Sequence, residues 1–517
     1  MHSSIRYLLV ATFLLIASSN TAAMAQTGDD ALRFAQRSPG LTAKSLALGG
    51  TGVAGIGDAS AFFTNPAGLA WSEGSSFGGA VVSALSTDLG VFNTQGPTSA
   101  IEKSLSSTNL GNLSYLFKVP TTRGSMIVGA SVSEVARFDR SLFFDGDNSQ
   151  NSVTDFFIPF STEFVLEDDG DGGVFPSFDR TISFIAFETF AIDLDAGLVA
   201  AGDLVPFNAA VSAGTVAQYG LVEEKGRLLE FNFGGAAEIV ENVMVGVSLN
   251  VPVGTYEYQR ILEEEDYRDD NDGTNGTTDF SYLYFSENFK SEMVGVNARF
   301  GVSAQVNDNL RLGASVETPT YYAIDDDFHT VLQTEFDNGD FFSYGLEDDQ
   351  QAGSGVFSYN ITTPWKISAG GAFNMANFTF FGDVEVINWS QTNLSSDGFS
   401  FEYENDLIER NLESVVNVRL GAAYDFNAWQ FRLGAGVYPD AHGTQFALNG
   451  FPDTDRERTF ASAGFGYSMT DDIKIDVAWM AEQYDDRYDL YNEVIDAPYV
   501  LEEVTRNRFQ VGFTVGF

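Results

Sequence analysis

Apolar and polar residues alternate with a period of two along many parts of the chain, most clearly at the C-terminus. In the segment 508–517, RFQVGFTVGF, every second residue from Phe509 to Phe517 is apolar, and Gln, Gly or Thr stands between them. Because successive side chains of a strand point to opposite faces, this pattern predicts a β-strand. A strand of a soluble sandwich shows the same alternation. The length, close to the roughly 9 to 11 residues of a membrane-crossing strand, favours a transmembrane barrel.

The same alternation returns at intervals through the rest of the chain. Further strands are predicted at 113–119, 126–132, 243–251, 294–306, 310–316, 365–373, 416–425, 431–437 and 473–481. Their second face carries polar and glycine residues, so we expect that face to line a wet lumen.

The connections between the predicted strands alternate between short and long. The short links are 120–124, 240–242, 307–309, 374–377, 427–428 and 469–472. The long, acidic links are 86–109, 139–226, 259–288, 319–356, 391–411, 440–457 and 485–502. Six short turns and seven long loops require fourteen strands. Short turns at one end and long loops at the other are typical of outer-membrane barrels. The sequence therefore predicts an all-β transmembrane barrel of 14 antiparallel strands in the bacterial outer membrane.

The N-terminal 25 residues have the features of a secretory signal peptide. Arg6 precedes an apolar run from Tyr7 to Ala17, and Ala23-Met24-Ala25 precedes Gln26. We therefore expect residues 1–25 to be a signal peptide that is cleaved after Ala25. The chain has no cysteine, and no later segment reaches 18 consecutive apolar residues. Disulfides, thiolate chemistry and helical membrane spans are therefore not expected.

The chain is strongly acidic, with 27 basic and 72 acidic residues and a net charge of −45. Nucleic acid is not an expected partner, because its phosphates would be repelled. The acidic runs 167–172 and 269–273 have carboxylate chemistry suited to divalent cations, but neither follows the spacing of an EF-hand loop. Divalent cations in the loops are therefore a candidate ligand, whereas no specific metal site and no cofactor are predicted.

A glycine-rich stretch near the N-terminus raises a different hypothesis. The segment 49–68, GGTGVAGIGDASAFFTNPAG, looks like a phosphate-binding loop. A P-loop needs a Lys followed by Ser or Thr, and a dinucleotide site needs a strand before and a helix after the glycines. The stretch contains no Lys, so nucleotide binding is not predicted.

This stretch resembles the N-terminal hatch of the FadL/OmpP1 (TodX-like) family of outer-membrane transport proteins, which share a Gly-rich stretch, an Asp-Ala element and an Asn-Pro-Ala motif. The matching positions are Gly49, Gly50, Gly52, Asp58, Asn65, Pro66, Ala67 and Gly68. A weaker similarity covers the segment 363–390. The segment 418–440 is similar to family members from Bacteroidetes-type bacteria.

The resemblance implies a hatch at residues 26–74 that plugs the lumen of a barrel formed by residues 75–517. It also implies transport of hydrophobic small molecules, such as long-chain fatty acids or aromatic hydrocarbons. In the family these are captured under extracellular loops and released sideways through the wall near the third strand. We expect a monomer surrounded by outer-membrane lipid and lipopolysaccharide.

The long link 139–226 is expected to be a folded, partly helical extracellular loop, because its Phe- and Ile-rich segment 180–204 argues against disorder. Phe184, Phe187 and Phe190 are candidates for lining a ligand site, or else for forming the loop's own small core.

Several charged residues are expected to face the lumen. Arg419 and Arg432 are among the cations at lumen-facing positions, together with Arg299, Arg311, Lys366 and Lys474. Most are expected to pair with lumen acids such as Asp383, Glu385, Asp425 and Asp476. Arg419 and Arg432 are also candidates for binding a ligand head group.

Three other functions compete with passive transport. Some relatives are outer-membrane scaffolds or shuttles that collect secreted proteins, and this is the main alternative. An enzyme is not predicted, because His329 and His442 lie in acidic loops without a nucleophile motif. An open porin is disfavoured, because fourteen strands make a narrower barrel than the 16 to 18 of general porins and the hatch fills it.

Overall fold

The computed structural model describes residues 28–94, 100–168, 173–211, 214–271, 279–347, 350–443, 454–491 and 494–517. The predicted signal peptide lies outside these residues. Among the described residues, no helix is long and apolar enough to cross a bilayer.

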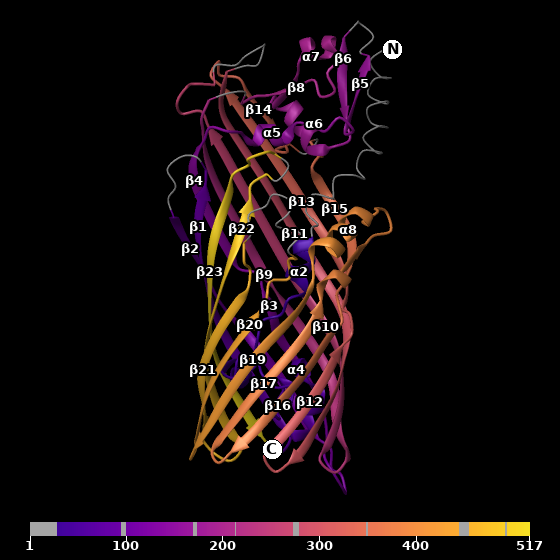
Figure 1. Ribbon diagram of the computed structural model, residues 1–517, viewed down its shortest axis with the longest axis vertical. Helices are drawn as coiled ribbons and strands as arrows, with labels where there is room; N and C mark the ends of the chain where they lie inside the picture. Colours follow the sequence, from indigo (N-terminus) through magenta and orange to yellow (C-terminus); the bar gives the residue numbers. More distant parts are fainter. Residues whose placement is uncertain are drawn as a thin grey trace.

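Fourteen antiparallel strands close into a tilted barrel, which confirms the predicted strand count (Figure 1). Three of the fourteen are each made of two consecutive segments, and β23 pairs with β1 to close the wall. In chain order the wall consists of β1 (Ser76–Asn93), β2 (Ala100–Lys118), β3 (Met126–Arg137) with β4 (Arg140–Asn148), β9 (Val216–Val240), β10 (Val243–Glu265), β11 (Phe280–Asn307), β12 (Leu310–Glu317) with β13 (Tyr321–Phe336), β15 (Ser354–Thr362) with β16 (Lys366–Met375), β17 (Phe378–Asn388), β19 (Ser414–Phe426), β20 (Trp429–Tyr438), β21 (Arg458–Ser468), β22 (Ile473–Asp489) and β23 (Tyr499–Gly516).

The six short links all fall at turns at the base of the barrel, as predicted. Asn242, Ala376 and Asn427 have positive φ in three of these turns. The long links are shorter than predicted, because the strands continue far into them. For example, β1 reaches Asn93 and β2 begins at Ala100, whereas a loop was predicted over 86–109.

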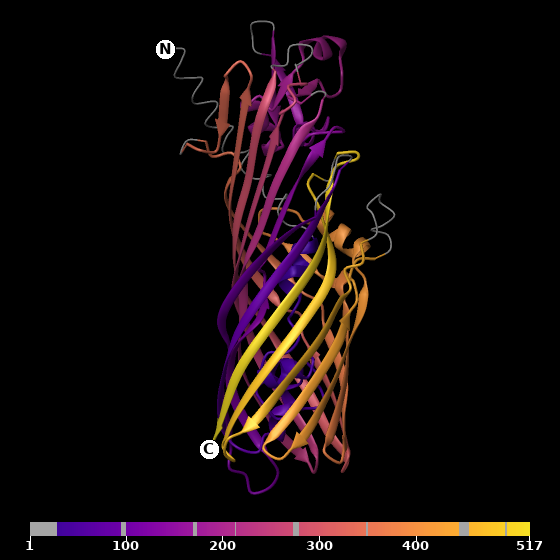
Figure 2. The same ribbon diagram turned by 90° about the vertical axis from the view of Figure 1, so that its left-hand side faces the viewer.

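One side of the wall is much taller than the other (Figure 2). β9, β10 and β11 have 25, 23 and 28 residues, whereas β16, β17 and β20 have 10, 11 and 10. A strand of about 11 residues is sufficient to cross the membrane. The tall strands therefore extend well beyond it.

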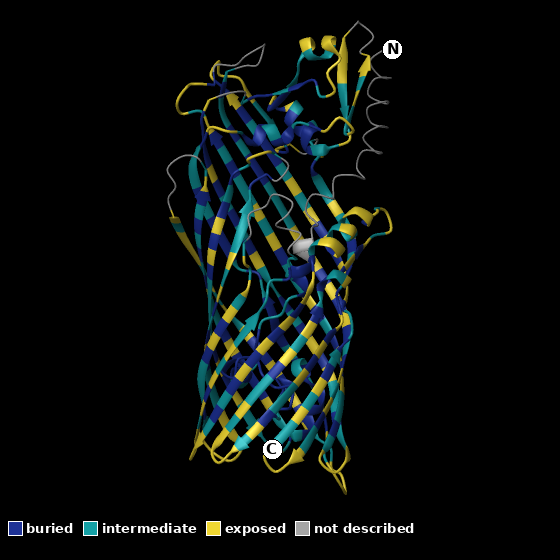
Figure 3. Cartoon of the chain, viewed as in Figure 1, coloured by how far each residue is buried: buried dark blue, intermediate teal, exposed yellow. Residues whose placement is uncertain are grey.

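Buried and exposed residues alternate along the tall strands (Figure 3), but the face that carries the apolar residues changes from the lower to the upper part. In the lower part of β10, Val247 and Leu249 are exposed on the outer face and Asn250 is buried inside. In the upper part, Leu262 is buried inside and Glu257 is exposed outside. The lower wall thus presents apolar side chains to lipid, and the upper wall presents polar side chains to water.

A hatch of short helices fills the lower lumen. It consists of α2 (Gly28–Ala35), α3 (Ala43–Ala47), α4 (Ala61–Thr64) and the 3₁₀ helix η3 (Pro66–Trp71). Thr42 caps α3, since its Oγ1 accepts from the backbone N–H of Ser45 at 3.1 Å. Asn65 caps η3, and Pro66 takes the first helical position, where no N–H is needed.

A folded cap stands over the tall side of the barrel. It consists of α5 (Val153–Phe157), β5 (Phe164–Asp168), β6 (Val174–Phe178), α6 (Thr181–Glu188), β7 (Ile192–Leu194), α7 (Ala196–Ala201) and β8 (Phe207–Ala209). This matches the expected partly helical extracellular loop. Smaller elements on the upper side are β14 (Phe341–Tyr344), η4 (Trp389–Gln391), β18 (Asn393–Ser395) and α8 (Glu402–Asn411).

Candidate functional site

A cavity of about 910 Å³ lies inside the barrel between the hatch and the cap. Leu32, Ser45 and Gly50 of the hatch line its lower end, and Ile182 and Ile185 of α6 line its upper end. Cavities of roughly 300 to 1,000 Å³ hold small organic molecules. The sequence predicted a lumen between a plug and a loop, and the structure forms a ligand-sized space there.

Asn65 joins two parts of the hatch to the barrel wall. Its Nδ2 donates to the carbonyl oxygens of Val53 at 2.6 Å and of Val302 on β11 at 2.8 Å. Its Oδ1 accepts from the backbone N–H of Ala67 at 3.0 Å. The side chain is fully buried. All polar atoms of the side chain are therefore engaged in holding the hatch.

The other residues of the hatch motif serve close packing and local turns. Gly49 and Gly50 have φ of 67° and 73°, which favours glycine. Asp58 Oδ1 accepts from the backbone N–H of Ser60 at 2.9 Å. Gly68 lies against Gly55: a Cβ added at Gly68 would stand 3.0 Å from the Gly55 Cα. The motif thus forms the folded plug that the resemblance implies.

Glycines of the wall make room for the hatch. A Cβ on Gly301 of β11 would collide with Asn65 Oδ1, and one on Gly246 of β10 would collide with the backbone of Pro66 and Ala67. A Cβ on Gly434 of β20 would collide with Gly49. Glycine within a strand commonly marks a close backbone approach. The glycines on the second face of the predicted strands therefore form the seat of the plug.

An aspartate on the wall binds the glycine-rich loop itself. Asp383 Oδ2 on β17 accepts from the backbone N–H groups of Gly52 at 2.7 Å and Val53 at 3.1 Å. Asp383 is 3% exposed. Gly52 thus belongs to an anchor between the loop and the wall.

The upper end of the hatch is held by Arg37 and Tyr322, which sequence reasoning did not find, and by Lys366, which was expected to face the lumen. Arg37 Nη2 donates to the Tyr322 hydroxyl at 2.6 Å, and its Nε lies 4.0 Å from Glu230. Lys366 Nζ donates to the carbonyl oxygen of Ala35 at 3.1 Å. No local pattern marks Arg37, because its partner is 285 residues away.

Buried charges on the wall complete this network. Arg299 pairs with Glu317 and also donates to the carbonyl oxygen of Phe62 in α4. Lys366 lies 3.7 Å from the same Glu317. These pairs tie α4 and the end of α2 to β11, β12 and β16.

The two predicted ligand arginines lie in different places. Arg419 lines the cavity, and its Nη1 lies 3.4 Å from the Tyr438 hydroxyl and 3.9 Å from Glu385. Arg432 does not line the cavity, and its Nη1 pairs with Asp476 at 2.5 Å. Both pairs agree with the expected pairing of lumen charges.

The three predicted phenylalanines do not line the cavity and contact other aromatic rings instead. Phe184 contacts the ring of Tyr344 and Phe187 contacts that of Phe178, with centroids 5.8 and 5.5 Å apart. Phe190 lies 4.5 Å from Phe342 and is 44% exposed. Ile182 and Ile185, from the same helix, reach the cavity instead.

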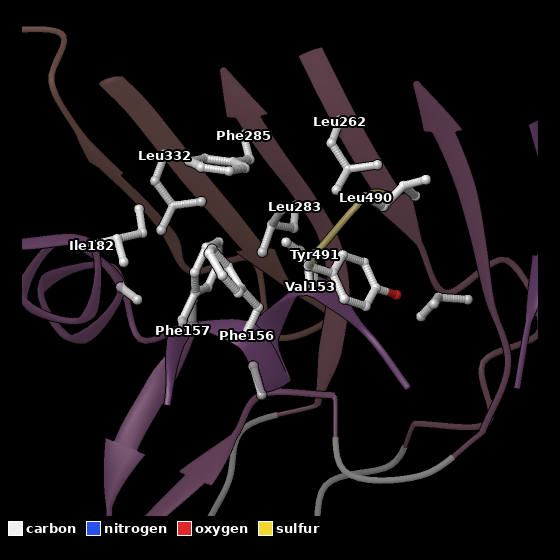
Figure 4. Packing of buried hydrophobic residues seen from close by; sticks show 14 of the residues in the cluster. Val153, Phe156, Phe157, Ile182, Leu262, Leu283, Phe285, Leu332, Leu490 and Tyr491 are labelled. Atoms are coloured by element: carbon white, nitrogen blue, oxygen red, sulfur yellow. The ribbon is translucent and has the colours of Figure 1, made fainter. Parts of the chain in front are cut away.

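The cap is built on an apolar core shared with the tall strands. Figure 4 shows Phe156 and Phe157 of α5 facing Leu283 and Phe285 of β11, with Ile182 beside them. This core explains why the upper parts of the tall strands carry apolar residues on their inner face. It fixes the cap over the cavity.

A buried carboxyl lies beneath α5, outside the membrane-crossing part of β10. Glu264 Oε1 accepts from the backbone N–H of Val153 at 2.8 Å and from Gln218 Nε2 at 2.6 Å, and Oε2 accepts from the Ser152 hydroxyl. Burial raises the pKa of Glu264 to about 7, although these donors oppose the shift.

The wall has a seam between β2 and β3, a stretch above Asn112 and Ser133 in which the two strands are not paired through their backbones. The two strands pair from Asn112–Ser133 down to Lys118–Ile127, and within the described strands they form no ladder above this level. β3 is irregular between Glu134 and Ala136. Within the seam, Arg137 Nη1 donates to the carbonyl oxygen of Ser107 on β2 at 3.3 Å. Side chains therefore hold the wall together there.

The two histidines of the described residues lie in the upper part of the barrel. His329 Nδ1 lies 2.7 Å from the Ser354 hydroxyl on the outer face, and His442 Nδ1 lies 2.6 Å from Asp440.

In the loops, the carboxylates of Asp269, Asp279 and Asp337 place oxygens within 4.8 Å of one another. Positions 169–172 and 272–273 of the predicted acidic runs lie outside the described residues.

Comparison with solved structures shows the same fold. The Pseudomonas putida toluene transporter TodX matches with a TM-score of 0.50 and 13% identity over 93% of this chain and 99% of that one. A Pseudomonas aeruginosa FadL homologue matches with a TM-score of 0.50 and 11% identity over 93% and 99%. A search of curated protein sequences finds no match.

A family model carries the assignment beyond the fold. The model described as outer membrane protein transport protein (OMPP1/FadL/TodX) matches residues 204–487, which is more than half of the chain. The match spans β9 to β22 and hence most of the wall that seats the hatch. The chain therefore belongs to the OMPP1/FadL/TodX family of outer-membrane transport proteins and lies in the bacterial outer membrane.

Proposed function

We propose that this protein is a passive conduit for hydrophobic small molecules, long-chain fatty acids or aromatic hydrocarbons, which enter under the cap and leave past the hatch. The observation that carries the proposal is the ligand-sized cavity between the cap and a plugged base. An open pore would instead have no hatch in the lower end of its lumen.

The seam between β2 and β3 supports release through the side of the wall. Leu85 of β1 is 39% exposed on the barrel surface and also lines the cavity, so the cavity approaches the outer surface next to the seam. Leu110 of β2, at 49% exposed, lies at the same level as the start of the seam and belongs to the apolar outer face. A molecule that leaves here would enter the lipid directly and would not have to displace the hatch below.

The proposal is tested by asking which small molecules accompany the purified barrel. Native mass spectrometry with lipid extraction on the detergent-purified mature chain is expected to show fatty acids or hydrocarbons. Ile185→Asp places a carboxylate in the cavity and is expected to remove them, whereas the milder Ile185→Ala is expected to weaken retention. Val165→Asp is the matched control, because Val165 is a 60% exposed residue of the cap that does not line the cavity.

Two outcomes would contradict transport. A correctly folded wild-type barrel that carries no small molecule and fails to pass toluene or decanol into liposomes would refute the proposal. If the same barrel retained secreted proteins from a cell extract through its cap, the scaffold alternative would replace it.

A further inference from the structure

The outer face of the tall wall changes from apolar to polar between two neighbouring rows of residues. The last apolar row across β9, β10, β11 and β13 consists of Leu229, Val253, Val294 and Ala323. The next outward-facing row, two residues further up each strand, consists of Arg227, Thr255, Glu292 and Asp325. The surface that faces the hydrocarbon of the bilayer therefore ends between these two rows.

Two more polar rows follow above this boundary. The lower one consists of Lys225, Glu257, Lys290 and Asp327. The upper one consists of Glu223, Gln259, Asn288 and His329. Rows on one face are about 7 Å apart along a strand, which is about 5 Å of height at a tilt of about 40°. The two rows thus lie about 10 to 15 Å above the last apolar row, beyond the roughly 5 to 8 Å of a phospholipid head-group layer.

A shallow hollow of about 320 Å³ lies in these two rows, and all eight of their residues line it. Only Asn288 of the eight also lines the lumen cavity, so the hollow belongs to the outer face of the wall. Its volume is at the lower end of the roughly 300 to 1,000 Å³ that hold small organic groups.

The surroundings of the hollow carry an excess of negative charge. The three polar rows contain five carboxylates and three cations. Lys225 Nζ donates to Glu223 at 2.6 Å, and Lys290 Nζ donates to Glu292 at 2.6 Å. This balance disfavours a phosphate, because like charges repel.

Two carboxylates of the hollow are available to an outside donor. Glu257 stands opposite Lys290 in the β10–β11 ladder, and Asp327 stands opposite it in the β11–β13 ladder. Neither Glu257 nor Asp327 forms a hydrogen bond or an ion pair with another described residue. Ionised carboxylates accept hydrogen bonds only, whereas each Lys has three donors and uses one here. Acceptors and donors thus stand side by side, as a sugar with several hydroxyl groups requires.

We propose that this hollow binds the sugar head group of an outer-leaflet glycolipid, whose acyl chains lie against the apolar wall below. Glu257 and Asp327 accept hydrogen bonds from the sugar hydroxyls, and Lys290 donates to a hydroxyl oxygen. The apolar surface directly below explains why the ligand is a lipid: Val253 and Val294 are 40% and 49% exposed. The site lies outside the lumen and does not depend on the proposed conduit.

The test compares two lipids with the same acyl chains on the full mature barrel in a sugar-free polyoxyethylene detergent. Diglucosyl diacylglycerol has a neutral sugar head group, and phosphatidylethanolamine has none. Native mass spectrometry is expected to show that wild type retains the sugar lipid about tenfold or more over phosphatidylethanolamine, since each net hydrogen bond contributes about two- to tenfold. Rough lipopolysaccharide, in a parallel arm, is expected to be retained like the sugar lipid.

The double variant Glu257→Ala, Asp327→Ala removes both available carboxylates. It is expected to lower retention of diglucosyl diacylglycerol about tenfold and to leave phosphatidylethanolamine within about twofold. Replacement by Gln and Asn, which keep an acceptor oxygen at each position, is expected to restore part of the loss. Glu265→Ala is the control, because Glu265 is exposed further up β10 and does not line the hollow.

Three outcomes would overturn the site. One is equal retention of the two lipids by wild type, and another is the same loss in Glu265→Ala as in the double variant. The third is a loss of sugar-lipid retention when EDTA is added to wild type, because a bridging cation would then hold the lipid in place of direct hydrogen bonds. In each case the passage of decanol into liposomes would still test the conduit separately.

Discussion

Removing the side chain of Asn65 is expected to loosen the hatch without opening the barrel. Asn65→Ala deletes two hydrogen bonds to buried carbonyl oxygens, of Val53 and Val302, and the cap of η3. Each bond to a carbonyl is worth about 1 kcal/mol and the cap about 1 kcal/mol. The free energy of local opening of the hatch is therefore expected to fall by about 3 kcal/mol.

Hydrogen exchange measures this change directly. The amides of Gly55 and Gly68 donate to Gly52 and Asn65 carbonyl oxygens that the substitution leaves in place. When the hatch opens and closes faster than its amides exchange, the exchange rate follows the equilibrium population of the open state. A loss of about 3 kcal/mol then accelerates the exchange of these amides by about 100-fold. Amides of β19 in the wall are expected to exchange at the wild-type rate. Asn338→Ala is the control variant, because the Asn338 side chain forms hydrogen bonds only with Asp340, and all its amides are expected to exchange as in wild type.

The wall glycine beside Asn65 gives an internal check. Gly301→Ala alone is expected to destabilise the hatch, because its Cβ would collide with Asn65 Oδ1. In the Asn65→Ala background that atom is gone, so the second substitution is expected to cost little and the two effects are not additive. Unchanged exchange at Gly55 and Gly68, or equal acceleration of β19, would refute the assigned role of Asn65.

Three further predictions concern other buried polar groups. Asp383→Ala frees the amides of Gly52 and Val53, and is expected to raise the ion conductance of single barrels in planar bilayers; a conductance equal to wild type would contradict the anchor. Arg432→Met leaves the half-buried Asp476 without this partner, so it is expected to lower the thermal unfolding temperature while the passage of decanol into liposomes stays the same. Glu264 makes attachment of the cap depend on pH, because burial raises its pKa to about 7 from about 4.5 in the unfolded chain. The folded cap keeps a proton that the unfolded chain releases, so this contribution is complete below about pH 4.5 and is lost as pH rises through about 7, by at most about 3 kcal/mol. The protection factors of the α5 amides, which are corrected for the intrinsic dependence of exchange on pH, are expected to fall over that range in wild type and to stay constant in Glu264→Gln.

The strands and the base of the barrel were predictable because lipid imposes a local pattern. Any residue on the outer face of the lower wall must be apolar, so alternation such as that from Phe509 to Phe517 identifies a strand without knowledge of its neighbours. The upper ends were misjudged because the same strands carry the opposite pattern there. Val247 faces lipid, whereas Leu262 on the same strand faces the cap core.

The candidate site was predictable only where its residues are close in sequence. The hatch motif from Gly49 to Gly68 is continuous, and its resemblance to the family located the plug. Arg37 and Tyr322 meet only through the folding of the barrel, and nothing near either residue in the sequence signals the partner. Loop phenylalanines were a reasonable choice for an apolar lining, but the cap needs a core of its own and uses Phe184 and Phe187 for it.

The same variants separate two routes out of the cavity. If a ligand leaves through the base, it must displace the hatch, and loosening the hatch in Asn65→Ala or Asp383→Ala should speed uptake into liposomes. If it leaves through the seam, the hatch is a fixed floor, and these variants should raise ion leakage without faster uptake of decanol. The structure favours the second result, because Asn65, Asp383 and Arg37 each bind the hatch to a different strand. At the seam, in contrast, Arg137 and Ser107 replace the backbone ladder with side-chain contacts that can part without unfolding a strand.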